Sequence, residues 1–248
     1  EGLFTQGMVC HETYKDENNN WLSPDEVDSK GENYFIKKNP LLKVTVGPSE
    51  SMSKSKKNVI DPENIINNYG ADAVRFFILS DSPPEKDVQW SEQGMLSAYK
   101  FVQKFWNLHL KIKNKIKLNN ESKEDTILKK FTNQLIHKIT QNLNNFSYNI
   151  IIANMHETYN FLFKHLDNKI SSENLNECYK KILIIFSPIL PHIINECQEE
   201  MGYKNNNLWP SVEKKYLENT TIDYVIQING KKRSLINAEI DLRQELLF

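Results

Sequence analysis

The sequence predicts a mainly α-helical protein with a smaller α/β part at its beginning. Three observations carry this prediction. Apolar residues recur every three or four positions through residues 92–202, which is the spacing of helices that bury one face. Short apolar stretches between turn residues occupy the first 46 positions and indicate strands. A polar run rich in serine and lysine, residues 48–62, leads directly into the first predicted helix.

Composition places the chain among globular proteins without an overall bias toward nucleic acid. It has 248 residues, 39% hydrophobic and 25% charged, and a net charge of −1. Binding to nucleic acid would therefore depend on local patches. Three distant cysteines without CxxC spacing indicate a reducing, cytoplasmic location, and no apolar run is long enough to cross a membrane. The His-Glu pairs at 11–12 and 156–157 lack the second histidine of a HExxH site, so we expect no metal site.

The first 46 residues predict short strands around a small insertion. Leu3–Val9 reads as a strand, and residues 14–43 are short apolar pieces between turns that can bury little core of their own. Leu41–Val46 predicts the strand that leads to the Ser/Lys loop, the name we give to residues 51–57.

The Ser/Lys loop alternates small hydroxyl side chains with longer ones: Ser51, Met52, Ser53, Lys54, Ser55, Lys56 and Lys57. It leads into a helix that Asp61 can cap and that Pro62 can begin. Hydroxyl and ammonium donors beside a helix N-terminus suit a polyanion, most simply the phosphates of a nucleotide.

Residues 52–55 match the last four letters of the KMSKS motif of class I aminoacyl-tRNA synthetases, and Ser51 stands where that family usually has lysine. A short Ser/Lys motif alone is weak, but the match continues through residues 56–62 and 69–75. This extension, and the stretch Gln6-Gly7-Met8-Val9, resemble the leucyl-tRNA synthetases in particular.

After the loop, apolar spacing predicts helices at about 62–69 and 71–79, separated by Gly70, and then an extended piece at 88–90. Four long apolar stripes follow, and a fifth helix ends before Gly202; short polar links between them predict antiparallel neighbours in a bundle. The stripes are centred on residues 95–116, 128–143, 151–166 and 175–185. Residues 186–193 and 208–210 are similar to the closing part of the anticodon-binding-type domain of class I synthetases.

Two groups of basic residues are candidates for contact with RNA phosphates. No acidic residue occurs from Gln93 to Asn120, and we expect Lys111, Lys113 and Lys115 there to bind tRNA. The second group adjoins a predicted Asn229-Gly230 hairpin turn: Lys231, Lys232 and Arg233. This hairpin resembles the start of the C-terminal tRNA-binding domain of the leucyl enzymes, with a helix beginning at about 241. A solvated helix face and an ordinary basic hairpin remain the alternative interpretations.

The resemblance implies an order of domains. Residues 1–60 would end a catalytic Rossmann domain, with a β-rich insertion at about 14–43 and the KMSKS-like residues 51–55. Residues 61–91 would form a connecting, stem-contact segment, and residues 92–219 a helical-bundle tRNA-binding domain. Residues 220–248 would begin a small α+β C-terminal domain. The chain thus reads as the C-terminal half of a synthetase, cut at both ends.

The resemblance also implies an activity: ATP-dependent activation of leucine to leucyl-adenylate, then transfer to tRNA(Leu). Lys54 would be the catalytic residue, within an ATP-binding loop of Ser51, Met52, Ser53, Lys54, Ser55 and Lys57. Mg²⁺ would arrive with ATP and be bound mainly by parts of the fold outside this sequence. We expect a cytoplasmic monomer whose partners are tRNA(Leu), leucine and ATP, and no membrane.

Two alternatives remain open at this point. One is another class Ia synthetase, for isoleucine, valine or methionine, although the Asn-Gly-Lys hairpin and the Gln-Gly-Met-Val stretch favour leucine. The other is a non-catalytic tRNA-binding module, because the 248 residues contain no His-x-x-His element of the HIGH type. For the same reason we expect the chain alone to make no aminoacyl-adenylate.

Overall fold

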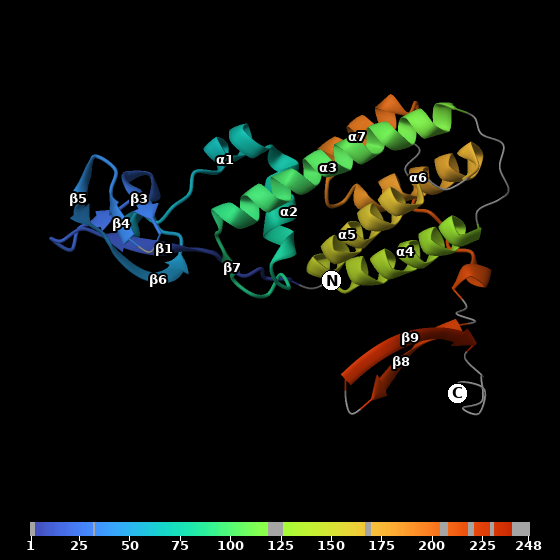
Figure 1. The fold of residues 1–248 in the computed structure, drawn as a ribbon. Coiled ribbons are helices and arrows are strands. Elements are labelled where there is room, and N and C mark those ends of the chain that lie inside the picture. Colours follow the sequence, from blue (N-terminus) through green and yellow to red (C-terminus); the bar gives the residue numbers. More distant parts are fainter. Residues whose placement is uncertain are drawn as a thin grey trace.

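The computed structural model describes residues 3–31, 33–118, 126–166, 170–203, 208–217, 221–228 and 231–239. Figure 1 shows a small β-rich region, a helical region beside it and a separate hairpin near the end of the chain. The helix-rich architecture with several small sheets confirms the predicted fold class at this level. No helix in the described ranges is long and apolar enough to cross a membrane.

A small mixed sheet is built around β1, Val9–Lys15. β1 pairs antiparallel with β2, Trp21–Leu22, and with β6, Thr45–Ser51, and parallel with β7, Val88–Gln89. The predicted strand at Leu3–Val9 is therefore wrong: pairing with β6 starts at Cys10, opposite Ser51. Gly7 lies before the strand and packs on the chain at Lys86, where a Cβ atom would come within 2.1 Å of the carbonyl oxygen.

A second, antiparallel sheet contains β3, Val27–Lys30, β4, Asn33–Ile36, and β5, Asn39–Lys43. The prediction of one strand over Leu41–Val46 is wrong: β5 ends at Lys43 and pairs with β4, whereas β6 starts at Thr45 and pairs with β1 of the other sheet. The small core under these strands consists of Tyr14, Leu22, Val27 and Val44.

Helices α1, Pro62–Tyr69, and α2, Ala71–Ser80, follow the Ser/Lys loop as predicted. The Asp61 carboxylate accepts a hydrogen bond from the Glu63 amide (3.0 Å) and caps α1. Gly70, with φ of 81°, ends α1 and lets the chain change direction before α2. The loop therefore opens onto a capped helix.

The predicted apolar stripes form helices α3 to α7: Glu92–Lys117, Thr126–Asn144, Tyr148–His165, Ser172–Phe186 and Pro191–Glu200. Serine caps begin two of them: Ser91 accepts from the Gly94 amide, and Ser171 from the Asn174 amide, both at 3.1 Å. Their stripes meet in one core that includes Met95, Phe105, Ile112, Leu128, Ile139, Met155, Leu175, Ile182 and Ile194. The same core includes Ala73, Phe76 and Phe77 of α2.

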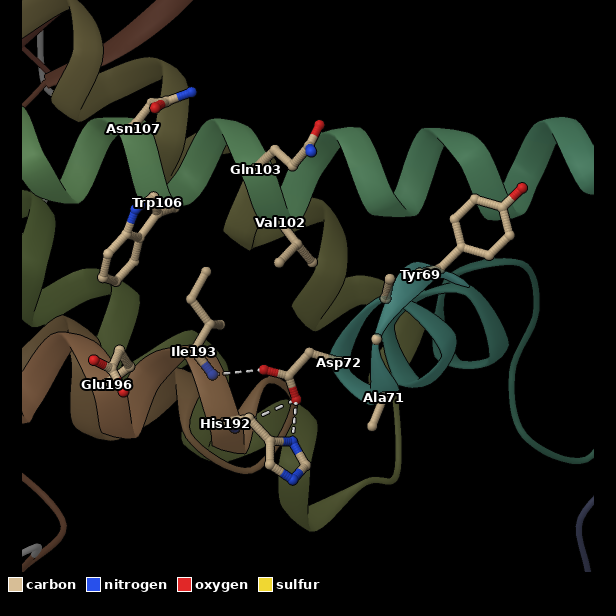
Figure 2. A pocket seen from close by; sticks show the side chains of 12 residues that line it. Tyr69, Ala71, Asp72, Val102, Gln103, Trp106, Asn107, His192, Ile193 and Glu196 are labelled. Carbon is tan, nitrogen blue, oxygen red and sulfur yellow. Dashed lines mark hydrogen bonds and ion pairs between the residues drawn. The ribbon is translucent and has the colours of Figure 1, made fainter. Parts of the chain in front are cut away.

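Helix α2 holds the corner between α6 and α7. The buried Asp72 carboxylate accepts from the backbone amide of Ile193 (2.7 Å) and from Nδ1 of His192 (2.8 Å), and so caps α7 from outside (Figure 2). One turn later, Arg75 donates to the carbonyl oxygens of Pro188 (2.7 Å) and Ile189 (3.1 Å). An open pocket of about 740 Å³ lies between α2, α3 and α7 above these contacts.

Near the end of the chain, β8, Thr221–Ile228, pairs antiparallel with β9, Lys231–Glu239, which confirms the predicted hairpin. Ile228 pairs with Lys231 across the turn. The Asn229-Gly230 turn itself and the helix predicted from about 241 lie outside the described residues.

Candidate functional site

The Ser/Lys loop lies between a strand and a helix. Its first residue, Ser51, ends β6, and the Met52 amide donates to the Val9 carbonyl of β1 (3.2 Å). Residues Lys54–Lys56 then form one turn of 3₁₀ helix, and Lys57 adopts the left-handed region, with φ of 55°. This turn reverses the chain so that it can enter α1.

Asn58 holds the loop in this shape, and it was not among the predicted site residues. Its side chain is fully buried. The amide oxygen accepts from the Ser53 backbone N–H (2.8 Å), and the amide nitrogen donates to the carbonyl oxygens of Glu50 and His11, both at 3.1 Å. One side chain thus joins both ends of the loop to β1. Asn58 lies within residues 56–62, which extend the family match, but nothing in that stretch distinguishes it from its neighbours.

The three lysines of the loop have different environments. Lys56 pairs with Glu50, and Lys57 lies 3.9 Å from a carboxylate oxygen of Glu26. Lys54 is exposed and has no ion pair or hydrogen bond to any residue that the structure describes. Its ammonium group is therefore the loop cation that is free to engage an external anion.

The hydroxyl groups of Ser53 and Ser55 lie 2.7 Å apart beside Lys54. Together these three side chains offer hydrogen-bond donors and no carboxylate, a set that suits phosphate oxygens rather than a bare metal cation. Ser51 is exposed at the end of β6 and supplies a hydroxyl in place of the ammonium usual in the family.

A polar cavity of about 500 Å³ lies on another side of the loop, between β1, the second sheet and the start of α1. Its lining includes several carboxylates: Glu12, Asp25, Asp28, Asp61 and Glu92. None of residues 51–57 lines it. Burial, and then the charge of Glu12, raise the pKa of Tyr14 there, and the Tyr14 hydroxyl donates to Glu12 (3.1 Å). These five carboxylates outnumber Lys37, the one lysine among the described lining residues, so this side of the loop disfavours phosphate.

The predicted bundle lysines do not form one strip. Lys113 donates to Glu200 of α7 (2.6 Å), and the Lys115 ammonium donates to the Leu166 carbonyl. Lys111 is exposed, with its ammonium 4.7 Å from the centre of the Phe163 ring. In the hairpin, Lys232 and Arg233 are exposed, whereas the side chain of Lys231 lies outside what the structure describes.

The buried histidine of the helical region, His109, has structural partners. His109 is buried, with Nδ1 3.0 Å from the Tyr179 hydroxyl and Nε2 3.4 Å from Glu200. Burial lowers the pKa of His109, although Glu200 acts in the opposite direction. Across the described ranges no three His, Cys, Asp or Glu side chains are grouped as metal ligands.

Comparisons with known proteins place this site in a family. The profile described as "tRNA synthetases class I (I, L, M and V)" matches residues 44–91, and that described as "Anticodon-binding domain of tRNA ligase" matches residues 125–247. The leucine–tRNA ligase of Orientia tsutsugamushi (strain Boryong) is 43% identical over 244 residues, or 96% of this chain. The chain belongs to the leucyl-tRNA synthetase family.

A second leucyl-tRNA synthetase, from Rickettsia bellii (strain RML369-C), is 40% identical over 94% of the chain. The chain spans 28% of the length of both of these relatives. A solved ternary complex, Agrobacterium radiobacter K84 agnB2 LeuRS with tRNA and LeuAMS, shares the fold with a TM-score of 0.66 and 23% identity, covering 80% of this chain and 26% of that one. The 43% and 40% identities to leucyl-tRNA synthetases favour leucine over isoleucine, valine and methionine, the alternatives that the motifs left open.

Proposed function

We propose that this chain supplies the Ser/Lys loop and the tRNA-binding helices of a leucine–tRNA ligase. The observation that carries the proposal is the free Lys54 ammonium, on a loop that Asn58 holds between β6 and α1, in a chain of this family. The complete enzyme would convert leucine and ATP to leucyl-adenylate and pyrophosphate, and then transfer leucine to tRNA(Leu). The segment boundaries at 60, 91 and 219 and the monomeric, cytoplasmic state remain predictions.

In the first step a leucine carboxylate oxygen attacks the α-phosphorus of ATP, and the bond to the bridging oxygen of pyrophosphate breaks. Negative charge grows on the α-phosphate and on the leaving group. A fixed ammonium that contacts these oxygens more closely in the transition state than in bound ATP lowers the barrier. We assign this role to Lys54, with Ser53 and Ser55 as additional donors and Lys57 assisting. Met52, half-buried, packs the loop against the domain. Mg²⁺ would be held by the triphosphate and by residues outside this chain.

Lysine substitutions within the loop of the complete ligase test this assignment. Lys54→Gln should slow leucine-dependent ATP–pyrophosphate exchange by about 10²–10³-fold, the usual effect of losing one preorganised donor. Lys56→Gln is the matched control, because Lys56 already pairs with Glu50 and the charge change is the same. Equal effects of the two substitutions, or an unchanged rate for Lys54→Gln, would remove Lys54 from the mechanism.

Two further measurements test the proposed function. Ser51→Lys should be tolerated, because Ser51 is exposed and the change restores the usual residue of the family. The 248-residue chain alone should show no exchange, since it lacks a His-x-x-His element. Exchange by this chain above the buffer background would contradict the proposed division of the active site.

A further inference from the structure

The pocket between α2, α3 and α7 has no part in the proposed function. We call it the α2–α3–α7 pocket. Its volume of about 740 Å³ is within the range of sites that hold small molecules. Its lining comes from the junction of α1 and α2, from one face of α3 and from the first two turns of α7.

The middle of this pocket is apolar. Val102 extends from α3 and Ile193 from α7 into the space between the two helices, as Figure 2 shows. Both side chains pack against the large helical core but are only partly buried by it. An apolar group in the pocket would therefore cover apolar surface that the fold itself leaves open.

An aromatic side chain lies at each end of the pocket, Trp106 at one and Tyr69 at the other (Figure 2). Trp106 stacks on the buried ring of His109, with 5.2 Å between centroids. Tyr69 packs edge-on against Tyr99, with 5.6 Å between centroids. These contacts fix both rings before any ligand arrives, so binding costs little side-chain entropy.

The charged groups of the lining favour a cation. Glu196 of α7 lies at the same end of the pocket as Trp106 (Figure 2), is exposed, and has no ion pair or hydrogen bond with any described residue. No lysine or arginine is among the lining residues that the structure describes. The guanidinium of Arg75, on the same helix as Asp72, lies outside this lining and donates to the carbonyl oxygens of Pro188 and Ile189.

The pocket does not suit an anion. The backbone amides at the N-terminus of α7 are the groups that would attract one. The Asp72 carboxylate already accepts from the amides of His192 (3.3 Å) and Ile193 (2.7 Å). Because Asp72 is buried beside the pocket, its negative charge adds to that of Glu196.

We propose that the α2–α3–α7 pocket binds a small organic cation, an ammonium or guanidinium group on an apolar body about the size of one aromatic ring. The cationic group lies beside the Trp106 ring and the Glu196 carboxylate, since a cation is attracted by an aromatic ring as well as by a carboxylate. The apolar body packs on Val102 and Ile193. We assign the site to a free small molecule, because its volume is typical of such sites and the thin alkyl chain of a partner's lysine would leave the apolar middle unfilled.

Methyl NMR of the 248-residue chain, titrated with phenylethylammonium, tests the site. The methyl groups of Ile193 and Val102 should shift saturably, with a dissociation constant of about 0.1–10 mM for a ligand of this size. The methyl groups of Ile139, which is fully buried in the core, should not shift and report that each protein is folded. Phenylethanol is the matched neutral probe. It should bind about 3- to 30-fold more weakly, because it loses the contacts of the charge with Trp106 and Glu196.

Two substitutions separate these contacts. Glu196→Gln should weaken phenylethylammonium binding by about 2- to 5-fold and leave phenylethanol binding nearly unchanged. Glu199→Gln is the control, because it makes the same charge change one turn later in α7, at an exposed residue outside the lining. Trp106→Leu should reduce the preference for phenylethylammonium over phenylethanol by about 2- to 5-fold.

Several results would overturn the proposal. They are the absence of saturable shifts at Ile193 and Val102, equal affinities for the two probes, and equal effects of Glu196→Gln and Glu199→Gln. Tighter binding of trilysine than of phenylethylammonium at the same methyl groups would also overturn it, because a polypeptide would then be the better occupant. None of these measurements uses ATP–pyrophosphate exchange, so they can fail while the proposed function stands, and the reverse.

Discussion

Asn58→Ala should release the Ser/Lys loop without unfolding the rest of the chain. The substitution removes the partner of the Ser53 amide and of the Glu50 and His11 carbonyl groups. Each hydrogen bond contributes about 0.5–1.5 kcal/mol net, so the three together stabilise the closed loop by roughly 2–4 kcal/mol. The value of 2–4 kcal/mol is an upper range for the loss of loop stability, because water can hydrogen-bond to the Ser53 amide and to the Glu50 and His11 carbonyl groups once the loop opens.

Amide hydrogen exchange measures this local opening directly. A loss of 2–4 kcal/mol should accelerate exchange of the Ser53 and Met52 amides by about 30- to 700-fold. Amides in the middle of α6 should be unaffected. Asn67→Ala is the matched control, because Asn67 is an exposed asparagine on the neighbouring helix α1. Asn58→Asp should not rescue the loop, since a carboxylate cannot donate to the Glu50 and His11 carbonyl groups.

Unchanged protection of the Ser53 amide in Asn58→Ala would refute the reasoning, because it would mean that backbone contacts alone hold the loop. Acceleration spread equally over α6 would also contradict it, because the effect would then be global.

Three other predictions concern positions outside this hydrogen-bond cluster. At residue 57, where φ is 55°, Lys57→Gly should give a protein about 1 kcal/mol more stable than Lys57→Ala in urea unfolding, and equal stability would show that the left-handed backbone is not strained. Asp72→Ala should lower the free energy of unfolding by about 0.5–2 kcal/mol through loss of the α7 cap, with Asp72→Asn less damaging. Because burial lowers the pKa of His109, protons bind preferentially to the unfolded chain, and stability should fall as pH drops below about 6.5; His109→Gln should flatten this dependence between pH 7 and 5.5.

The helices could be predicted from the sequence because their signals are local. Apolar spacing, the Ser91 and Ser171 caps and the Gly70 break each act within one or two turns, and the structure places helix ends close to them. Strand ends were less predictable, because they depend on a partner. β1 starts at Val9, where β7 pairs with it, and pairing with β6 begins at Cys10; nothing in Leu3–Val9 itself encodes these limits.

The candidate site likewise has one part that local sequence signals predict and another that depends on residues distant in the sequence. The Ser/Lys loop could be found from its residue types, which determine its chemistry whatever its neighbours are. Asn58 could not, because its role depends on carbonyl groups of residues 8 and 47 positions away. On α3, Lys111 and Lys115 lie beside α5, whereas Lys113 pairs with Glu200 of α7, because the helical angle and not proximity in sequence decides which side chains share a face.

The separation of the two hydrophobic cores has a consequence for cooperativity. Helix α2 and Val88 of β7 contribute to the large core of the helical region, whereas the separate hydrophobic cluster of the β-rich region has four buried members among the described residues. Under denaturant the β-rich region should therefore open as the weaker unit, with the helical unit still intact. Because Asn58 fastens the loop to β1, the loop belongs energetically to the weaker unit, although the helix that follows it packs with the stronger one.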